Sequence, residues 1–222
     1  MTRNRAKNLE RDAIKLSGAS CIEGCIPEDD FKKLIDGLSE KSQQDGALPI
    51  HKIAYAMVAV VSLTGMRTSS ILALRLSDIS DIKTIGRGVY GITIVTKTSP
   101  YRVTYVIPSI AYNIFQKVIE YTADYRENAP QNIKEMLFIT PKGKVTADAV
   151  NCIMKDVCRD VGIKEYTLRN VHKTYRVNFA MLFRDSIMAV GSTTHYYLSP
   201  TELGGRLSLN QEDVFHMELH RD

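Results

Sequence analysis

The sequence has no apolar stretch long enough to cross a membrane. Its longest uncharged apolar run covers residues 53–63 of 222, whereas a membrane-spanning helix needs about 20 consecutive apolar residues. No apolar segment follows the basic amino terminus, so a secretory signal is not expected. Hydrophobic residues make up 44% and charged residues 24% of the chain, which excludes disordered and fibrous classes. We therefore expect a soluble, cytoplasmic protein with a full hydrophobic core and no membrane partner.

The chain also lacks the patterns of common metal and nucleotide sites. Its four cysteines form a C-x3-C and a C-x5-C pair, and no further Cys or His ligands of a zinc site accompany them. His216 and His220 lie one helical turn apart without an evident third ligand, which favours a solvated helix end. No glycine-rich phosphate loop occurs. The sequence therefore predicts no metal and no cofactor.

Positive charge is in small excess and is concentrated in two segments. Lys and Arg number 29 against 25 acids, for a net charge of +4. Residues 19–50 have a net charge of −4, residues 159–184 have +4, and residues 83–102 hold four basic residues and no acid. The two basic segments indicate an anionic partner.

Apolar periodicity predicts a mainly helical fold with one small antiparallel sheet. Residues 83–107 are rich in β-branched and aromatic side chains and predict a hairpin, with its break at Ser99 and Pro100. A polar loop is expected near Pro130. Helices are expected at 1–18, from Pro27, over 50–63, after Gly65 (capped by Thr68 or Ser69 and reaching Leu76), from Ile110, from Thr146 as cap to Gly162, and over 167–183.

The last of these helices carries a basic strip. One face is apolar, and another places four cationic or titratable groups at i, i+3, i+4 and i+7: Arg169, His172, Lys173 and Arg176. A solvated basic surface is the ordinary interpretation of such a strip. No acid is interleaved, however, and such charges repel one another unless an anion lies against them. The strip therefore favours an anion-binding surface.

Three further groups suit phosphodiester chemistry. Arg67 lies between two predicted helices, where its guanidinium and free backbone N–H groups can hold a phosphate. Lys97 lies near the predicted hairpin turn, and Tyr196 and Tyr197 lie on a polar segment near the carboxyl terminus. Each residue taken singly also has an ordinary structural explanation. Arg67 could form an ion pair with an acid within 28–45, Lys97 could be a solvated turn residue, and Tyr197 could be a phenol in the core. Together, these groups suggest attack on phosphate by a protein nucleophile.

Over residues 26–205 the sequence resembles the catalytic domain of the tyrosine recombinases, or phage integrases. LTGMRTSSILALRLSDI at 63–79 is similar to the family's first box, which carries a catalytic arginine, and 90–108 is similar to its β-hairpin with a catalytic lysine. THYY at 194–197 resembles the nucleophile segment, in which Thr precedes the tyrosine by three residues, and this spacing selects Tyr197.

The resemblance implies a catalytic set and a mechanism. Tyr197 would attack a scissile phosphate and form a 3′-phosphotyrosyl link, while Lys97 would protonate the leaving 5′-oxygen. Arg67 would neutralise the non-bridging oxygens, helped by Arg169 and His172. The DNA-contacting residues would be Lys173, Arg176, Arg87 and Arg102. Double-stranded DNA is the implied partner, with self-association on the DNA and a nucleoid-associated location.

Two departures from the family pattern leave alternatives open. Lys173, Thr174 and Tyr175 align with the second box, but the preceding positions read Arg169-x-x-His172, with the family's His and Arg exchanged. In addition, residues 185–191 are short where the family has a helix with another phosphate-contacting residue. An active recombinase, a DNA-binding regulator that does not cleave, and a helical interaction protein without nucleic acid are therefore the three hypotheses.

The expected organisation is a basic segment at 1–25, the catalytic-type domain at 26–205 and a tail at 206–222. Family members usually have an amino-terminal domain that closes a clamp round the duplex. Only about 25 residues precede the catalytic-type domain here. The sequence is therefore compatible with a truncated form or with binding through half of the usual clamp.

Overall fold

The structure is a computed structural model that describes residues 24–86, 89–95 and 102–182. At its centre is helix α3 (Pro49–Thr64), which is buried along most of its length because its sequence is apolar nearly all round. Pro49 occupies its first turn, and Gly65 ends it with φ 62° and an N–H donated to the Val61 carbonyl at 2.9 Å. Both ends agree with the sequence prediction.

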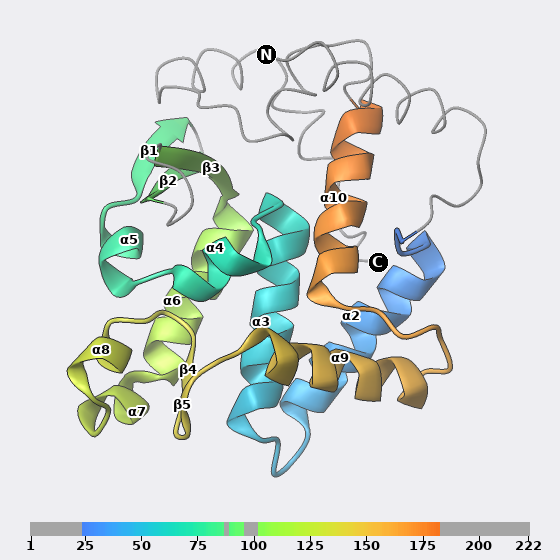
Figure 1. The fold of residues 1–222 in the computed structure, drawn as a ribbon, viewed down its shortest axis with the longest axis horizontal. Helices are drawn as coiled ribbons and strands as arrows, with labels where there is room; N and C mark the ends of the chain where they lie inside the picture. Colours follow the sequence, from blue (N-terminus) through green and yellow to red (C-terminus); the bar gives the residue numbers. More distant parts are fainter. Residues whose placement is uncertain (1–23, 87–88, 96–101, 183–222) are drawn as a thin grey trace.

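Four helices surround α3 (Figure 1): α2 (Glu28–Gln43), α6 (Ser109–Tyr121), α9 (Ala147–Asp160) and α10 (Leu168–Leu182). Acids fill the first turn of α2, where the helix dipole favours them. The Thr146 hydroxyl accepts the Ala149 N–H at 3.2 Å at the start of α9, which confirms the predicted cap. The core is thus a set of helices packed on one apolar helix.

The helix expected after Gly65 is two short helices. Helix α4 (Thr68–Ala73) and helix α5 (Leu76–Ser80) are separated at Leu74. The N-cap residue of α4 is Arg67, whereas the sequence favoured Thr68 or Ser69. The break arises because the 135–137 segment pairs with this point. The Leu76 N–H donates to the Glu135 carbonyl at 2.8 Å, and the Leu137 N–H donates to the Leu74 carbonyl at 2.8 Å. A distant segment therefore interrupts a locally helical pattern.

The predicted hairpin is part of a three-stranded antiparallel sheet of order β1-β2-β3 (Figure 1). Its strands are β1 (Lys83–Gly86), β2 (Val89–Val95) and β3 (Arg102–Pro108). Pairing of β2 with β3 runs from Val89 opposite Pro108 to Val95 opposite Arg102. Ile92, Tyr105 and Ile107 are buried, and β3 packs on α3 and α6. The hairpin was predicted, whereas β1 as an added edge strand was not.

The region near Pro130 was expected to be a polar loop and is instead partly helical. It contains α7 (Ala123–Glu127) and α8 (Gln131–Lys134), followed by the two-residue strands β4 (Ile139–Thr140) and β5 (Gly143–Lys144). The Arg126 guanidinium organises this region by donating to the carbonyls of Lys134, Met136 and Leu137. These long-range bonds are not visible in the local sequence pattern.

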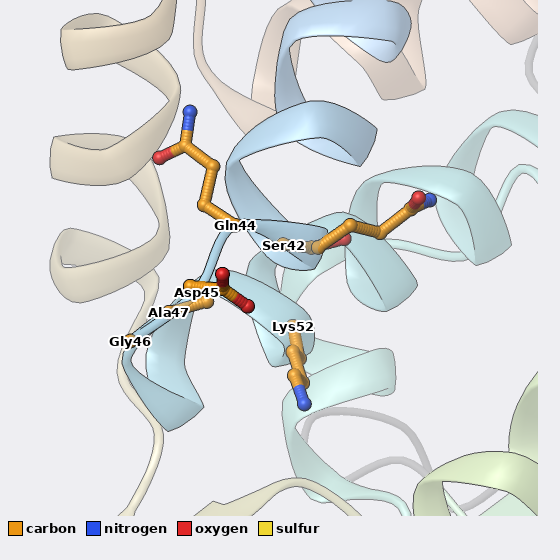
Figure 2. A pocket seen from close by; sticks show the side chains of 7 residues that line it. Ser42, Gln44, Asp45, Gly46, Ala47 and Lys52 are labelled. Carbon is orange, nitrogen blue, oxygen red and sulfur yellow. The ribbon is translucent and has the colours of Figure 1, made fainter.

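Within the described ranges, no helix is long and apolar enough to span a bilayer. An open depression lies between the end of α2 and the first turn of α3, lined by residues 42–47 and Lys52 (Figure 2). None of the predicted site residues lines it.

Candidate nucleic-acid interface

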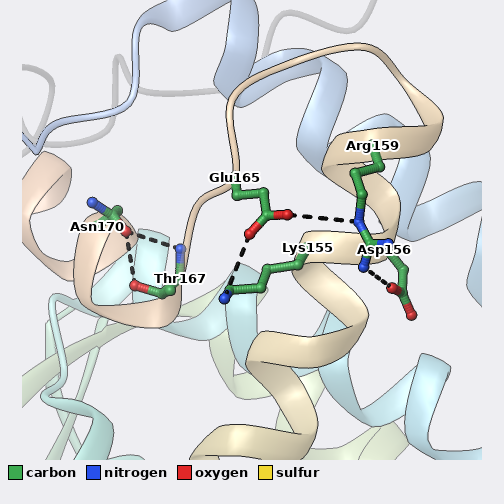
Figure 3. A network of polar contacts seen from close by, with 6 residues as sticks. All are labelled: Lys155, Asp156, Arg159, Glu165, Thr167 and Asn170. Carbon is green, nitrogen blue, oxygen red and sulfur yellow. Dashed lines mark hydrogen bonds and ion pairs between the residues drawn. The ribbon is translucent and has the colours of Figure 1, made fainter.

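The start of α10 is held by polar contacts from two directions. Thr167 donates from its N–H and its hydroxyl to the Asn170 side-chain oxygen at 2.9 and 2.7 Å (Figure 3), and the Leu168 N–H donates to Asn151 at 3.0 Å. In the preceding turn, Glu165 lies between Lys155 and Arg159 of α9, with ion pairs of 3.5 and 3.6 Å. These contacts determine where α10 begins relative to α9.

One edge of α10 binds the chain that leads into α2. The Asn170 amide donates to the Gly24 carbonyl at 2.9 Å, and the Thr174 hydroxyl accepts the Ile26 N–H at 2.8 Å. Lys173 is exposed on the same edge, and its Nζ lies 3.2 Å from the position that a Cβ on Gly24 would occupy. Lys173 therefore lies beside the entry to α2.

The other edge of α10 packs against the turn that carries Arg67. Gly65 has φ +62°, and its α-carbon lies so close to the Tyr175 ring that a Cβ there would overlap the ring carbons. Burial raises the pKa of Tyr175 to about 12, so its phenol stays neutral. This contact sets α10 against the 65–67 turn.

Arg67, His172 and Arg176 form a cluster at this edge. Burial, followed by the positive charges of Arg176 and Arg67, lowers the pKa of His172 to about 4. His172 is therefore neutral at physiological pH. Its Nε2 is buried and has no hydrogen-bond partner among the described residues. The cluster thus combines two guanidinium groups with a neutral imidazole whose Nε2 is buried.

Arg67 and Arg169 carry charge that no acid neutralises in the described part of the chain. Arg67 is exposed and forms no ion pair there, so the expected alternative of a partner within 28–45 is not seen. Arg169 is also exposed, but no described contact brings it to Arg67. The described contacts therefore bring Arg67 and Arg176 to His172, and none of them involves Arg169.

Several predicted site residues cannot be placed. Lys97, Arg87 and Tyr197 lie outside the described residues, as do the helix expected at 1–18, the short 185–191 segment, His216 and His220. Arg102 is the first residue of β3, opposite Val95. The roles assigned to these residues remain predictions.

The position of Arg176 and Arg67 beside the same imidazole was not predicted from the sequence, nor was the Gly65–Tyr175 contact. The available signals were the i, i+4 spacing of His172 and Arg176 and a glycine at a helix end. Neither signal says which side of the basic strip faces the 65–67 turn. Among the described residues, no three His, Cys, Asp or Glu side chains gather as metal ligands.

No protein family model matches this sequence, and no curated protein does. Solved structures of recombinases do match in fold. The pre-cleavage complex of the XerH site-specific recombinase bound to difH substrate has a TM-score of 0.60 at 13% identity, over 86% of this chain and 52% of that chain. The post-cleavage complex of XerH bound to palindromic difH substrate has a TM-score of 0.60 at 13% identity, over 88% of this chain and 55% of that chain. The structure of XerA recombinase has a TM-score of 0.56 at 14% identity, over 87% of this chain and 66% of that chain.

This chain thus spans about half the length of the XerH chains that it matches. At such low identity the likeness shows the fold alone. The helices around α3 and the small antiparallel sheet agree with it. The chain therefore has the mainly helical catalytic-domain fold of the tyrosine recombinases.

Proposed function

We propose that this protein binds double-stranded DNA at the surface formed by Arg67 and α10, and that it cleaves and rejoins a DNA strand through Tyr197. The observation that carries the proposal is the cluster of Arg67, His172 and Arg176, assembled from segments about 100 residues apart in the sequence. Cationic side chains gathered in this way repel one another, and an anion placed between them offsets that repulsion. DNA phosphate is such an anion.

In the proposed reaction, the Tyr197 hydroxyl oxygen attacks phosphorus as the phenol gives its proton to solvent water. A 3′-phosphotyrosyl bond forms, the bond to the 5′-oxygen breaks, and Lys97 gives a proton to that oxygen. Attack by the 5′-hydroxyl of another strand reverses these steps and rejoins the DNA. Arg67 stabilises the charge that develops on the non-bridging oxygens, a contribution typically worth about 10²–10³ in rate. No cofactor takes part.

The recombinase fold supports DNA as the partner, because the XerH structures were solved as complexes with difH substrate. In this proposal residues 26–205 form the catalytic-type unit, preceded by a basic segment at 1–25 and followed by a tail at 206–222. The protein self-associates on DNA, so that strands from two sites are exchanged. A nucleoid-associated location follows from DNA binding.

A regulator that binds DNA without cleaving it is the second candidate. His172 aligns with the arginine of the family's second box and is neutral here, since burial and two neighbouring guanidinium groups lower its pKa to about 4. A neutral imidazole supplies less charge to a phosphate than a guanidinium does. Arg169, the arginine of the exchanged pair, is exposed and is not brought to Arg67.

The test has two stages. First, sequences retained by the purified protein are selected from a genomic or random duplex library, and binding to the enriched site is measured at several salt concentrations. Second, the enriched site is made as a nicked suicide duplex and incubated with wild-type protein and with Tyr197→Phe. We expect salt-dependent binding by both proteins and a covalent adduct with the wild type only.

Three other outcomes separate the hypotheses. Binding without any adduct, together with regulation that Tyr197→Phe leaves unchanged, favours the regulator. An adduct that persists in Tyr197→Phe shows that Tyr197 is not the nucleophile. No enriched sequence and no salt-dependent duplex binding would refute DNA binding and leave the helical interaction protein.

A further inference from the structure

The contact between Tyr175 and Gly65 determines which residues of the basic strip lie beside Arg67. A helix rises about 1.5 Å per residue, so Arg176 is about 1.5 Å and His172 about 4.5 Å from Tyr175 along the axis of α10. Arg169 is about 9 Å from it by the same measure. Because the Tyr175 ring lies against Gly65, the 65–67 turn is level with His172 and Arg176.

Rotation around the helix axis separates Lys173 from this turn but leaves Arg169, about 120° from Tyr175, on the same side as Arg176, so only the rise along the axis separates Arg169. At about 100° per residue, His172 lies about 60° from Tyr175 around α10, Arg176 about 100° and Lys173 about 160°. Lys173 accordingly lies toward Gly24 on the opposite edge. The charges of Arg67 and Arg176 both act on His172, which is the arrangement that these angles predict.

Arg176 and Arg169 also differ in how far their side chains are buried. Arg169 is exposed, whereas Arg176 is half-buried and its Nε is buried. A partly buried guanidinium has fewer accessible rotamers than an exposed one, so less entropy is lost when it binds a ligand. Arg176 is therefore better placed than Arg169 to act together with Arg67.

We propose that Arg176 supplies the second guanidinium of the phosphate site, so that Arg67 and Arg176 hold the same DNA phosphate from two sides and His172 Nε2 lies between them. Arg169 then lies outside the site. This inference rests on the proposed function, because the phosphate is that of bound DNA, and it applies whether or not the strand is cut. It also returns to the site a planar guanidinium donor, which the exchanged second box lacks at its usual position.

The experiment compares Arg176→Gln with Arg169→Gln, two variants that each remove one positive charge from α10. Affinity for the selected duplex is measured after circular dichroism and thermal unfolding have shown that both variants are folded. We expect Arg176→Gln to weaken binding about 10–100-fold, since a charged hydrogen-bonding partner is lost. We expect Arg169→Gln to weaken it less than about 3-fold, as for an exposed charge. Arg176→Lys keeps the positive charge but lacks the planar guanidinium, so its affinity should lie between those of the two Gln variants. It also replaces Arg176→Gln in the comparison if that variant does not fold.

A second measurement follows the His172 ring nitrogens by NMR as pH is varied, with and without the selected duplex. The groups known to act on this imidazole are Arg67 from the 65–67 turn and Arg176 from α10. A phosphate between the two guanidinium groups offsets both charges, so DNA should raise the pKa of His172. That rise should persist in Arg169→Gln and be smaller in Arg176→Gln.

The inference is overturned if Arg169→Gln weakens binding as much as Arg176→Gln, or if DNA leaves the His172 titration unchanged. Failure of the proposed function is distinguishable from these results, because the wild type would then select no duplex and there would be no affinity for the variants to change.

Discussion

Gly65 is required at its position for two independent reasons. Its φ of +62° is unfavourable for residues with a Cβ by about 1–2 kcal/mol, and a Cβ would also overlap the Tyr175 ring, adding about 1–3 kcal/mol of overpacking. Gly65→Ala should therefore lower the free energy of unfolding by about 2–5 kcal/mol in urea denaturation. Gly162→Ala is the matched control, because Gly162 has φ +68° and nothing within 4 Å of a Cβ.

Gly162→Ala should show only the backbone cost, about 1–2 kcal/mol. Equal destabilisation by the two substitutions would show that the ring contact contributes nothing. Because Gly65 lies two residues before Arg67, the same variant should also weaken DNA binding.

His172 makes stability depend on pH in a defined direction. Its pKa is about 4 in the folded chain and about 6.5 when unfolded, so the unfolded state holds the extra proton between these values. Stability contributed by the neutral imidazole is thus fully present above pH 6.5 and is lost as pH falls toward 4. His172→Asn should flatten the pH dependence of the unfolding free energy in this window. Parallel curves for wild type and variant would contradict the lowered pKa.

At the scale of elements, Arg126 connects the segments between α6 and β4. Its guanidinium donates to three carbonyls at 2.6–2.9 Å and to the Thr122 hydroxyl at 2.8 Å. Arg126→Met would leave these partly buried acceptors without donors, so we expect a loss of about 2–4 kcal/mol in unfolding free energy. Arg75→Met is the control, because its ion pair with Glu135 is exposed and should contribute less than about 1 kcal/mol.

If Arg126→Met proves no more harmful than Arg75→Met, the 122–137 region is held by its apolar contacts alone. A large loss for Arg126→Met would instead confirm that these hydrogen bonds stabilise the segment whose bridge to Leu74 separates α4 from α5.

Helix α10 is expected to supply a sequence-independent part of DNA binding. The double variant Lys173→Gln/Arg176→Gln should reduce the log–log salt slope of binding by about 1.8, or about 0.9 for each phosphate contact, and should weaken binding to all duplexes alike. Lys155→Gln/Arg159→Gln removes the same charge from α9, where both side chains are ion-paired with Glu165. That control should leave the slope unchanged. Equal effects of the two pairs would mean that only net charge matters.

At the scale of the whole molecule, the proposed chemistry requires Tyr197, Lys97 and Arg67 to converge in one basic cleft. We expect this to happen within one subunit. A mixture of Arg67→Gln and Tyr197→Phe proteins should then form no covalent adduct on the nicked duplex, because neither protein has a complete site. An adduct from the mixture would show that a tyrosine is delivered to the neighbouring subunit, since exchange of an element between identical protomers is a low-cost rearrangement.

Local sequence patterns were sufficient to predict the main elements. The apolar run of α3 with Gly65 after it, the Thr146 cap of α9 and the basic strip of α10 are properties of consecutive residues, and the structure confirms all three elements. The β-branched segment likewise predicted strands β2 and β3. Helix periodicity and cap chemistry act over a few residues, so they are visible without knowledge of the fold.

Contacts between distant segments decided the rest. Pairing of the 135–137 segment with Leu74 and Leu76 divides a stretch whose own periodicity favours one helix. The sequence placed Arg169, His172, Lys173 and Arg176 on one strip, but the packing of Tyr175 on Gly65 determines which of them face Arg67. Spacing along a helix specifies a face, whereas the partner of that face depends on close packing between segments about 100 residues apart. The sequence alone therefore indicated a basic helix, and the tertiary structure determined that Arg67 and Arg176 both lie close to His172.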